Sequence, residues 1–268
     1  MKKFLCVIFL LIFVSSAFAD DVYVGTLAQL NTSEEEYKNF VLEGRETVGF
    51  NFLSHENENF RYYDSLMTMQ MALNAGEISE VQLPEVVGEY FANLNPSAYT
   101  VSCVSQVRPT YLAFGFLAKN VEMRDKFNEM LKLIKEDGTL EKLRLDYIEN
   151  FKENDLKPIK FTKFDGADTI KIALTGDLPP IDFVAANGEP AGFNMAIISE
   201  IGRQAKLNIE VLDIDAGARS AALASGRADA VLWYKVTRDF ELQTDIPADI
   251  ILSDSYYEWN KFLHIKKK

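Results

Sequence analysis

The chain has 268 residues, and its 48% hydrophobic and 25% charged residues are the composition of an ordinary globular protein. The formal net charge of -12 is spread along the chain without a long acidic block. This balance argues against a nucleic-acid-binding surface and favours a soluble protein.

The first residues have the features of a secretory signal peptide. Two lysines precede an apolar stretch over residues 4–14, and residues 17–19 form a small-residue cleavage pattern. The apolar stretch is too short to span a bilayer, which takes roughly 20 apolar residues. We therefore expect residues 1–19 to be removed and the mature protein to be periplasmic or secreted. Because Cys6 lies inside the apolar stretch and not at the cleavage point, a lipid anchor is not supported.

The mature chain begins with alternating strand and helix patterns. Residues 22–27 (VYVGTL) predict a strand. Residues 65–76 (SLMTMQMALNAG) predict a helix, because Leu66, Met69 and Leu73 fall on one face and a glycine closes the segment. The stretch ISEVQL that follows predicts a short buried strand.

A strand and two helices are predicted next. Residues 111–119 (YLAFGFLAK) predict the strand, residues 121–138 the clearest amphipathic helix of the chain, and residues 139–151 a second helix. Cys103 precedes them in the stretch YTVSCVSQV and would be the only cysteine of the mature chain. With apolar and small neighbours, it is expected to be a buried strand residue.

A charged, proline-containing stretch follows over residues 152–168, and we interpret it as a connection between two α/β lobes. Strand patterns at 169–176 and 208–214 then alternate with helix patterns at 192–207 and 218–226. The stretch ADAVLW closes this series as another strand. Such alternation implies a mostly parallel sheet flanked by helices.

One short phrase occurs twice, as ALNAGEISEV at residues 72–81 and as ALASGRADAV at residues 222–231. Both copies predict a helix, a glycine turn and a strand, which is the second half of a βαβ crossover. Two similar sheets suggest a cleft between them, with a binding site beyond the carboxyl ends of the strands.

The loop TGDLPPIDFVAANGEPAGFN follows the strand at 169–176 and carries Asp177 in front of two prolines. A rigid loop at the carboxyl end of a strand holds a ligand at little ordering cost. An ordinary turn-rich connection would have the same composition, so both interpretations stay open.

Three stretches of the later half carry a resemblance to a known family. IKIALTGDLPPIDFVAANGEPAGFN, ALASGRADAVLWYKVTRD and ILSDSYYEW resemble, in order and spacing, the first lobe of the periplasmic (extracellular) solute-binding proteins of family 3, the polar amino-acid receptors of ABC importers. The resemblance implies an α/β fold of the type II periplasmic binding protein class, a two-lobed clamp with a mostly parallel sheet in each lobe.

The earlier half is similar to the second lobe of the same family, so the lobe order resembles a circular permutation. Residues 20–160 would form the lobe like the family's second, and residues 161–268 the lobe like its first. The chain stops at KFLHIKKK, where the family's strand crosses the hinge. The two termini are therefore expected to lie close together near the hinge.

Ligand residues of the first lobe follow from the resemblance. Arg238 would pair with a ligand carboxylate, although it directly follows Thr237 in VTRDF, where the family spaces the two residues apart. Arg219 would begin a helix lining the cleft and strengthen the preference of a helix N-terminus for anions. A solvated surface arginine is the alternative at either position.

Aromatic residues would complete this side of the site. Trp233 and Tyr234 occupy a strand end at which an aromatic ring would stack on the ligand or narrow the pocket. Strand alternation favours only one of them facing the cleft, and a buried core residue is the alternative. Ile181 stands where the family has an aromatic ring after the two prolines, so a ring is missing there.

The second lobe departs further from the family. Pro84 stands where an aspartate would receive the ligand's amino group, and the neighbouring Glu85 would serve that role or be a solvent-facing helix-start residue. Ser54 and His55 lie near the position of the family's carboxylate-binding loop.

The resemblance implies a monomer that binds a small polar solute, an amino acid, and passes it to a membrane permease. It implies no cofactor, no catalytic residue and no nucleic-acid partner, and the stretch SHENEN lacks the spacing of a zinc-binding helix. Two alternatives stay open: an enzyme on the same fold, such as a dehydratase or lyase, and a sensor or interaction module whose ligand site has degenerated.

Overall fold

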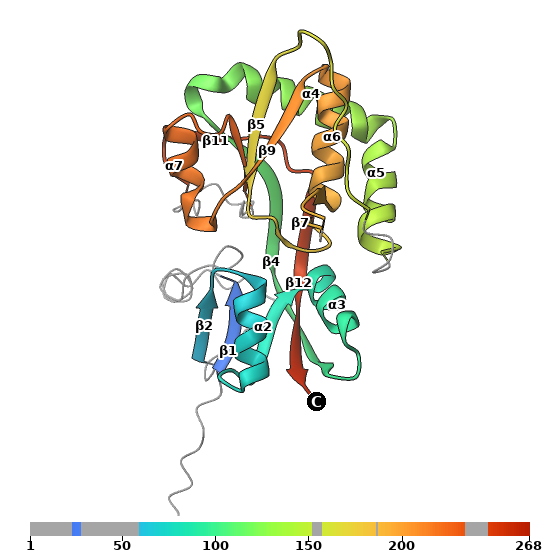
Figure 1. Cartoon of the computed structure of the whole chain (residues 1–268), viewed down its shortest axis with the longest axis vertical. Coiled ribbons are helices and arrows are strands. Elements are labelled where there is room, and N and C mark those ends of the chain that lie inside the picture. The colour runs from blue at the N-terminus through green and yellow to red at the C-terminus, as the bar shows by residue number, and fades with distance from the viewer. Residues whose placement is uncertain (1–22, 28–58, 152–156, 186, 234–245) are drawn as a thin grey trace, which may run out of the picture.

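The computed structural model describes residues 23–27, 59–151, 157–185, 187–233 and 246–268. Figure 1 shows these residues as two lobes, one above the other, through both of which run the long strands β4 (Tyr99–Leu117) and β12 (Tyr257–Lys267). The expectation of an α/β protein with two lobes is confirmed.

The lower lobe contains β1 (Tyr23–Leu27), β2 (Asn59–Tyr63), α2 (Leu66–Ala75), β3 (Glu80–Pro84) and α3 (Glu85–Leu94), with the first part of β4 and the last part of β12. The upper lobe contains the 3₁₀ turn η2 (Ala118–Asn120), α4 (Val121–Glu136), α5 (Thr139–Arg144), the π-helical turn η3 (Leu145–Glu149), β5 (Thr169–Leu174), β6 (Asp177–Leu178), β7 (Asp182–Val184), β8 (Pro190–Ala191), α6 (Phe193–Ala205), β9 (Asn208–Asp213), the 3₁₀ turn η5 (Ala216–Ala218), α7 (Arg219–Ala224), β10 (Ala230–Trp233) and β11 (Ile250–Leu252).

The two lobes repeat one sheet plan. The strands form a continuous sheet in the order β2-β1-β3-β12-β4-β10-β5-β9, with β11 on β4. In the lower lobe β2, β1 and β3 run parallel and β12 runs against them, while in the upper lobe β9, β5 and β10 run parallel and β4 runs against them. Each lobe is therefore a mostly parallel sheet with one reversed strand that comes from the crossing pair.

The repeated phrase of the sequence occupies equivalent places in this plan. One copy forms the end of α2 and β3, beside the reversed strand β12, and the other forms α7 and β10, beside the reversed strand β4. The turn of each copy contains a glycine in the left-handed region, with φ of 79° at Gly76 and 72° at Gly226. The prediction of a helix, a glycine turn and a strand is confirmed for both copies.

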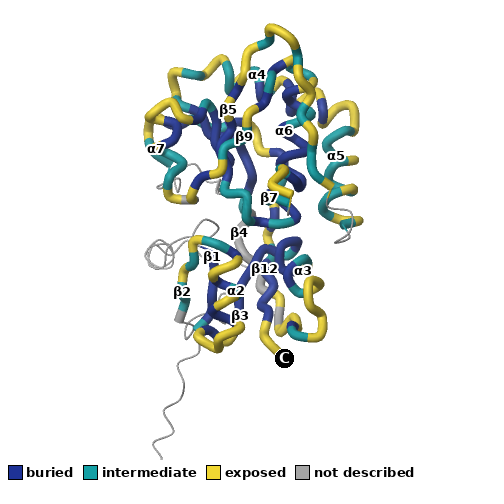
Figure 2. Tube along the Cα trace, in the orientation of Figure 1, coloured by how far each residue is buried: buried dark blue, intermediate teal, exposed yellow. Residues whose placement is uncertain are grey.

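Helix α2 forms as its pattern predicts. The side chain of Ser65 caps the first turn by accepting a hydrogen bond from the backbone N–H of Thr68 at 3.2 Å. Leu66, Met69 and Leu73 all face the core, and the helix ends at Ala75 in front of the predicted glycine. The opposite face of the helix is solvent-exposed, as Figure 2 shows.

The core of the upper lobe is built on β4. Phe114 of this strand packs with its ring centroid 5.2 Å from that of Phe127 in α4 and 5.1 Å from that of Tyr256, just before β12. All three side chains are buried. Figure 2 shows the buried strands inside the flanking helices in both lobes. Cys103 lies in β4 as expected, but its side chain is outside the described residues.

Helices α4 and α5 belong spatially to the upper lobe, where both pack against α6. The predicted boundary puts these two helices in a lobe formed by residues 20–160 and α6 in a lobe formed by residues 161–268. The chain reaches the upper lobe earlier than that boundary because β4 crosses from one lobe to the other within a single strand.

The described start of β1 and the end of β12 lie together at the far end of the lower lobe. Val24 and Lys266 both pair with Glu80, from opposite sides of β3. The expected closeness of these two ends is therefore present. Their expected position near the hinge is wrong, because β12 continues past the hinge to the bottom of the lower sheet (Figure 1).

Candidate functional site

The carboxyl ends of the parallel strands in the two lobes point toward each other. In the lower lobe, β2 leads into the N-terminus of α2 and β3 into the N-terminus of α3, whereas in the upper lobe β5 leads into the loop that contains β6. Ligands of open parallel sheets bind beyond the carboxyl ends of strands. The candidate site is therefore the boundary where these segments meet, which we call the inter-lobe face.

Asp177 makes a direct contact across the inter-lobe face. Its Oδ2 accepts a hydrogen bond from the backbone N–H of Leu66, the first residue of α2, at 3.3 Å. The contact is partly buried, and 111 residues separate its partners along the chain. A carboxylate at this position is favoured because the N-terminus of a helix carries unsatisfied N–H groups and a partial positive charge. The structure thus places this predicted site residue between the lobes.

The loop that presents Asp177 is fixed to the upper lobe by backbone contacts. Gly176 adopts a φ of 63°, and its carbonyl accepts a hydrogen bond from the N–H of Val184 at 3.0 Å. Asp177 itself pairs with Phe183 across the small β6–β7 ribbon. The turn favours glycine because of this backbone angle, and a side chain at Gly176 would also meet Cγ2 of Val184 at 3.2 Å, so that Val184 would have to shift slightly.

A series of buried hydrogen bonds also anchors this loop. The N–H of Gly176 donates to Oδ1 of Asp182 at 3.2 Å, and Oδ2 of Asp182 accepts from Nδ2 of Asn194 at 2.8 Å. The hydroxyl of Tyr256 donates to Oδ1 of Asn194 at 2.9 Å. Burial, with the charge of Asp182 nearby, raises the pKa of Tyr256 well above its ordinary value. The phenol therefore stays protonated and is the donor at the end of the chain.

The residues of this buried hydrogen-bond series are not among those predicted from the sequence. Asp182 and Asn194 are fully buried, and they stabilise the loop without facing a ligand. Both residues lie in the quoted loop sequence, but nothing in their spacing indicates that they pair.

Ile181 is fully buried in the core of the upper lobe. The aromatic ring that the family resemblance leads one to expect at this position is thus replaced by a residue that packs inward. Nearby, Oγ1 of Thr175 is buried and makes no hydrogen bond to the described residues. Thr175 is the first residue after β5 and lies two residues before Asp177.

The other described site candidates of the upper lobe lie at element ends. Arg219 is the first residue of α7, directly after the 3₁₀ turn η5, and is half-buried. Trp233 is the last residue of β10, where its backbone pairs with Ala113 of β4, and its side chain is outside the described residues. Both positions agree with the strand and helix termini predicted for them.

Five predicted site residues lie outside the described residues. They are Ser54, His55, Tyr234, Thr237 and Arg238.

Glu85 belongs to the lower lobe, whereas Asp177 belongs to the upper lobe. It is the first residue of α3 and forms an ion pair with Lys261 of β12 at 3.2 Å, with both side chains about two-fifths exposed (42% and 41%). Glu85 also raises the pKa of Glu89 in the same helix, although burial of Glu89 is the larger cause. The hydrogen bond of Asp177 to α2 and the ion pair of Glu85 with β12 thus involve different partners.

Tyr257, the first residue of β12, lies near the carboxylates of this helix. Burial raises its pKa to about 12, with Arg144 opposing the shift and the carboxylates of Glu85, Glu149 and Glu89 adding to it. On the same side, the rings of Tyr90 in α3 and Phe151 after η3 have centroids 5.3 Å apart. The lobes thus meet on a second surface, formed by α3 and the end of η3.

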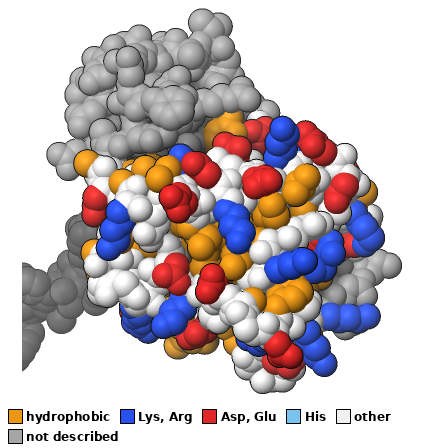
Figure 3. All heavy atoms as spheres, turned by 90° about the horizontal axis from the view of Figure 1, so that it is seen from above, with side chains coloured by type: hydrophobic (Ala, Val, Ile, Leu, Met, Phe, Trp, Pro, Cys, Tyr) orange, Lys and Arg blue, Asp and Glu red, His pale blue; other side chains and the backbone are white. Residues whose placement is uncertain are grey.

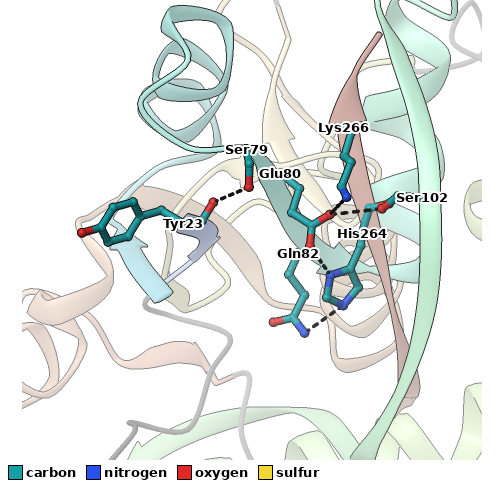
Figure 4. A network of polar contacts seen from close by, with 7 residues as sticks. All are labelled: Tyr23, Ser79, Glu80, Gln82, Ser102, His264 and Lys266. Atoms are coloured by element: carbon teal, nitrogen blue, oxygen red, sulfur yellow. Dashed lines mark hydrogen bonds and ion pairs between the residues drawn. The ribbon is translucent and has the colours of Figure 1, made fainter. Parts of the chain in front are cut away.

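A second polar cluster fixes β12 inside the lower sheet (Figure 4). Oε1 of Glu80 lies 3.1 Å from Nδ1 of His264, and Nε2 of His264 lies 3.3 Å from Nε2 of Gln82. The other oxygen of Glu80 accepts from Ser102 at 3.2 Å and pairs with Lys266 at 3.3 Å. Burial raises the pKa of Glu80, but the hydrogen bond and charge of His264 and the charge of Lys266 outweigh it and lower the pKa overall.

This cluster ties together three strands, since Glu80 and Gln82 come from β3, Ser102 from β4 and His264 from β12. His264 is only 1% exposed, so the cluster has a structural role inside the lower lobe.

Within the described residues no group of three or more His, Cys, Asp or Glu side chains is placed to hold a metal ion. None of the helices in the described parts of the chain combines the length and apolarity that crossing a membrane requires.

On the face shown in Figure 3, acidic and basic side chains are interspersed and do not gather into a patch of one sign.

Residues 170–243 match the family model of the bacterial extracellular solute-binding proteins, family 3. The matched part begins in β5 and includes the Asp177 loop, α6, α7 and β10. A comparison with curated protein sequences found no match.

Several solved structures are similar to the chain at low sequence identity. The zinc-bound ligand-binding component of an ABC-type import system from Staphylococcus aureus has 9% identity and a TM-score of 0.42, and the match covers 92% of this chain and 65% of that one. The chain thus spans slightly less than two thirds of that protein. A putative L-cystine ABC transporter from Listeria monocytogenes has 14% identity, a TM-score of 0.42 and coverages of 92% and 82%. The GluR0 ligand-binding core from Nostoc punctiforme in complex with L-glutamate has 9% identity, a TM-score of 0.40 and coverages of 92% and 85%.

Proposed function

We propose that this protein is an extracytoplasmic solute-binding protein, which captures a small polar solute between its lobes and delivers it to the permease of an ABC importer. The observation that carries the proposal is the match of residues 170–243 to the family 3 solute-binding model. The two-lobed arrangement, with the carboxyl ends of the parallel strands facing each other, supports it.

The crossing strands supply the hinge of such a mechanism. Only β4 and β12 connect the lobes among the described residues, and their pairing shifts register between Trp259 and Lys261. A bulge of this kind bends and twists a strand pair locally. Closure about the hinge is favoured by a solute because only the closed state lets the solute contact both lobes.

The ligand we propose is an amino acid. Arg238 or Arg219 would hold its carboxylate through a planar guanidinium, while Asp177 or Glu85 would receive its amino group. Trp233, Tyr234, Thr237, Ser54 and His55 would complete the wall of the site. Glu85 would have to exchange its ion pair with Lys261 for the ligand, and Asp177 would have to exchange its hydrogen bond from the N–H of Leu66.

The remaining parts of the proposal concern the chain as a whole. Residues 1–19 would direct export to the periplasm or the outside and then be removed. The lobe like the family's second would precede the lobe like its first, as in a circular permutation. The protein would act as a monomer, without a cofactor, a metal or catalytic residues.

Calorimetry and thermal-shift screening of the exported protein over amino acids, small peptides and polyamines test the proposal. We expect one chemical class to raise the melting temperature, and Arg238→Ala and Asp177→Ala to weaken its binding at least tenfold, which corresponds to about 1.4 kcal/mol. Arg203→Ala is the matched control, because Arg203 is an exposed residue of α6 that pairs with Glu200. The absence of any binding solute, or equal loss of affinity in the control, would remove the support for solute capture.

A further inference from the structure

The contact of Asp177 with α2 links the two lobes at a place away from the crossing strands β4 and β12. The acceptor Oδ2 belongs to the upper lobe and the donor N–H of Leu66 to the lower lobe, 3.3 Å apart. Strand β6 and helix α2 also lie in contact around this bond. Breaking the contact is therefore a necessary part of separating the lobes on this side.

The first turn of α2 has a backbone N–H group that needs an acceptor from another part of the protein. The hydroxyl of Ser65 accepts from the N–H of Thr68 and its carbonyl from the N–H of Met69, so the N–H of Leu66 needs an acceptor from outside the helix. A carboxylate is the best acceptor at this end because the helix dipole adds to the hydrogen bond. The first turn of α2 contains no acidic residue of its own, so Asp177 supplies the negative charge from the other lobe.

The carboxylate is held rigidly on the upper-lobe side. The turn at Gly176 is anchored by Asp182, which is anchored in turn by Asn194 and Tyr256. Tyr256 directly precedes β12, the crossing strand. The position of the carboxylate is thus tied to the same segment about which the lobes would move.

We propose that Asp177 is an inter-lobe latch: its carboxylate binds the N-terminus of α2 and favours the state in which the lobes touch. The latch acts without any bound solute, and it sets how often the inter-lobe face is open to receive one. Its effect on solute affinity rests on the proposed function, whereas its effect on lobe separation does not. Solute affinity scales with the population of the binding-competent state, so altering the latch alters the apparent affinity.

Single-molecule energy transfer on the protein alone measures the latch directly. Fluorophores at Met71 of α2 and at Arg227 after α7, both exposed and in different lobes, report the lobe separation. We expect Asp177→Ala to lower the ratio of touching to separated molecules by about two- to fivefold, the effect of a single charge at a helix N-terminus. Asp177→Asn, which keeps an acceptor oxygen and loses the charge, is expected to fall between the wild type and the alanine variant.

Asp137→Asn is the matched control. Asp137 also accepts a hydrogen bond at a helix N-terminus, from the N–H of Thr139 at 2.8 Å, but both partners lie in the upper lobe. Its replacement is expected to leave the distance distribution unchanged. A distribution that is the same in Asp177→Ala as in the wild type, or a shift of equal size in Asp137→Asn, overturns the latch. Circular dichroism and the melting curve of each variant establish that it is folded. The two tests are independent. An unchanged distance distribution would overturn the latch but not the proposed solute binding, and a screen that finds no ligand would not affect the distance measurement.

Discussion

At the scale of single residues, the hydroxyl of Tyr256 donates the hydrogen bond that completes the buried chain from the Asp177 loop to the crossing strand. Tyr256→Phe would leave Oδ1 of Asn194 buried without this donor. An unsatisfied buried acceptor costs about 1–3 kcal/mol, so we expect the free energy of unfolding to fall by that amount in urea titrations. Tyr257→Phe is the control, since the Tyr257 hydroxyl makes no hydrogen bond to the described residues. Equal losses in the two variants would contradict a special role for Tyr256.

The carboxyl of Glu80 gives a prediction about pH. Because its pKa is lowered below 4.5 in the folded protein, its ionised form stabilises the fold at pH values above 4.5, and this contribution is lost as the pH falls below that value. We expect the stability difference between the wild type and Glu80→Gln to shrink between pH 5 and pH 3 in urea unfolding. The groups that face Glu80 are Ser102, His264 and Lys266. A difference that stays constant over this interval would show that the cluster does not favour the ionised form.

At the scale of elements, the repeated helix, turn and strand depends on a left-handed glycine in each lobe. A side chain at Gly76 or Gly226 would meet no atom within 4 Å, so only the backbone angle opposes a substitution. We expect Gly76→Ala and Gly226→Ala each to lower the free energy of unfolding by about 1–2 kcal/mol in urea titrations. Gly217→Ala is the control, because Gly217 also has open space around it but no positive φ. A loss in the control as large as in the variants would contradict this explanation.

The elements also show what could be predicted from the sequence. Local signals identified α2 and its glycine, because spacing and capping are properties of adjacent residues. They also placed Asp177 at a strand end, although not against α2. The pairing of Glu80 with His264, 184 residues apart, leaves no local signal. The same holds for Asp182 and Asn194, whose roles depend on how the loop folds back on α6.

The assignment of α4 and α5 to a lobe illustrates the same limit. The strand pattern at 111–119 predicts a strand but not that it continues a strand starting at Tyr99 in the lower lobe. A single strand that crosses between lobes carries the following helices with it. Chain order alone therefore gives a lobe boundary later than the point at which the chain enters the upper lobe.

At the scale of the whole molecule, the positions of the chain ends allow a test of the permuted lobe order. Val24 and Lys266 pair with Glu80 from the two strands that flank β3. The two residues are therefore about 10 Å apart, which is twice the spacing between neighbouring strands. A short Gly/Ser linker spans that distance easily. New ends opened at Gly166, in an exposed turn before β5, would restore the order in which the upper-lobe β5 comes first.

We expect this rearranged chain, which starts at Gly166, ends at Asp165 and has Lys268 joined through the linker to Asp20, to fold. It breaks no strand of the sheet, and turns of this kind tolerate new termini. The expected result is a circular dichroism spectrum like that of the original chain and a cooperative melting curve within several degrees of it. A matched rearrangement with new ends between Ala113 and Phe114 should not fold, because both residues are buried in β4 and pair with β10. If the first chain fails to fold as the second does, the two lobes depend on the order in which they are connected, and the circular permutation is contradicted.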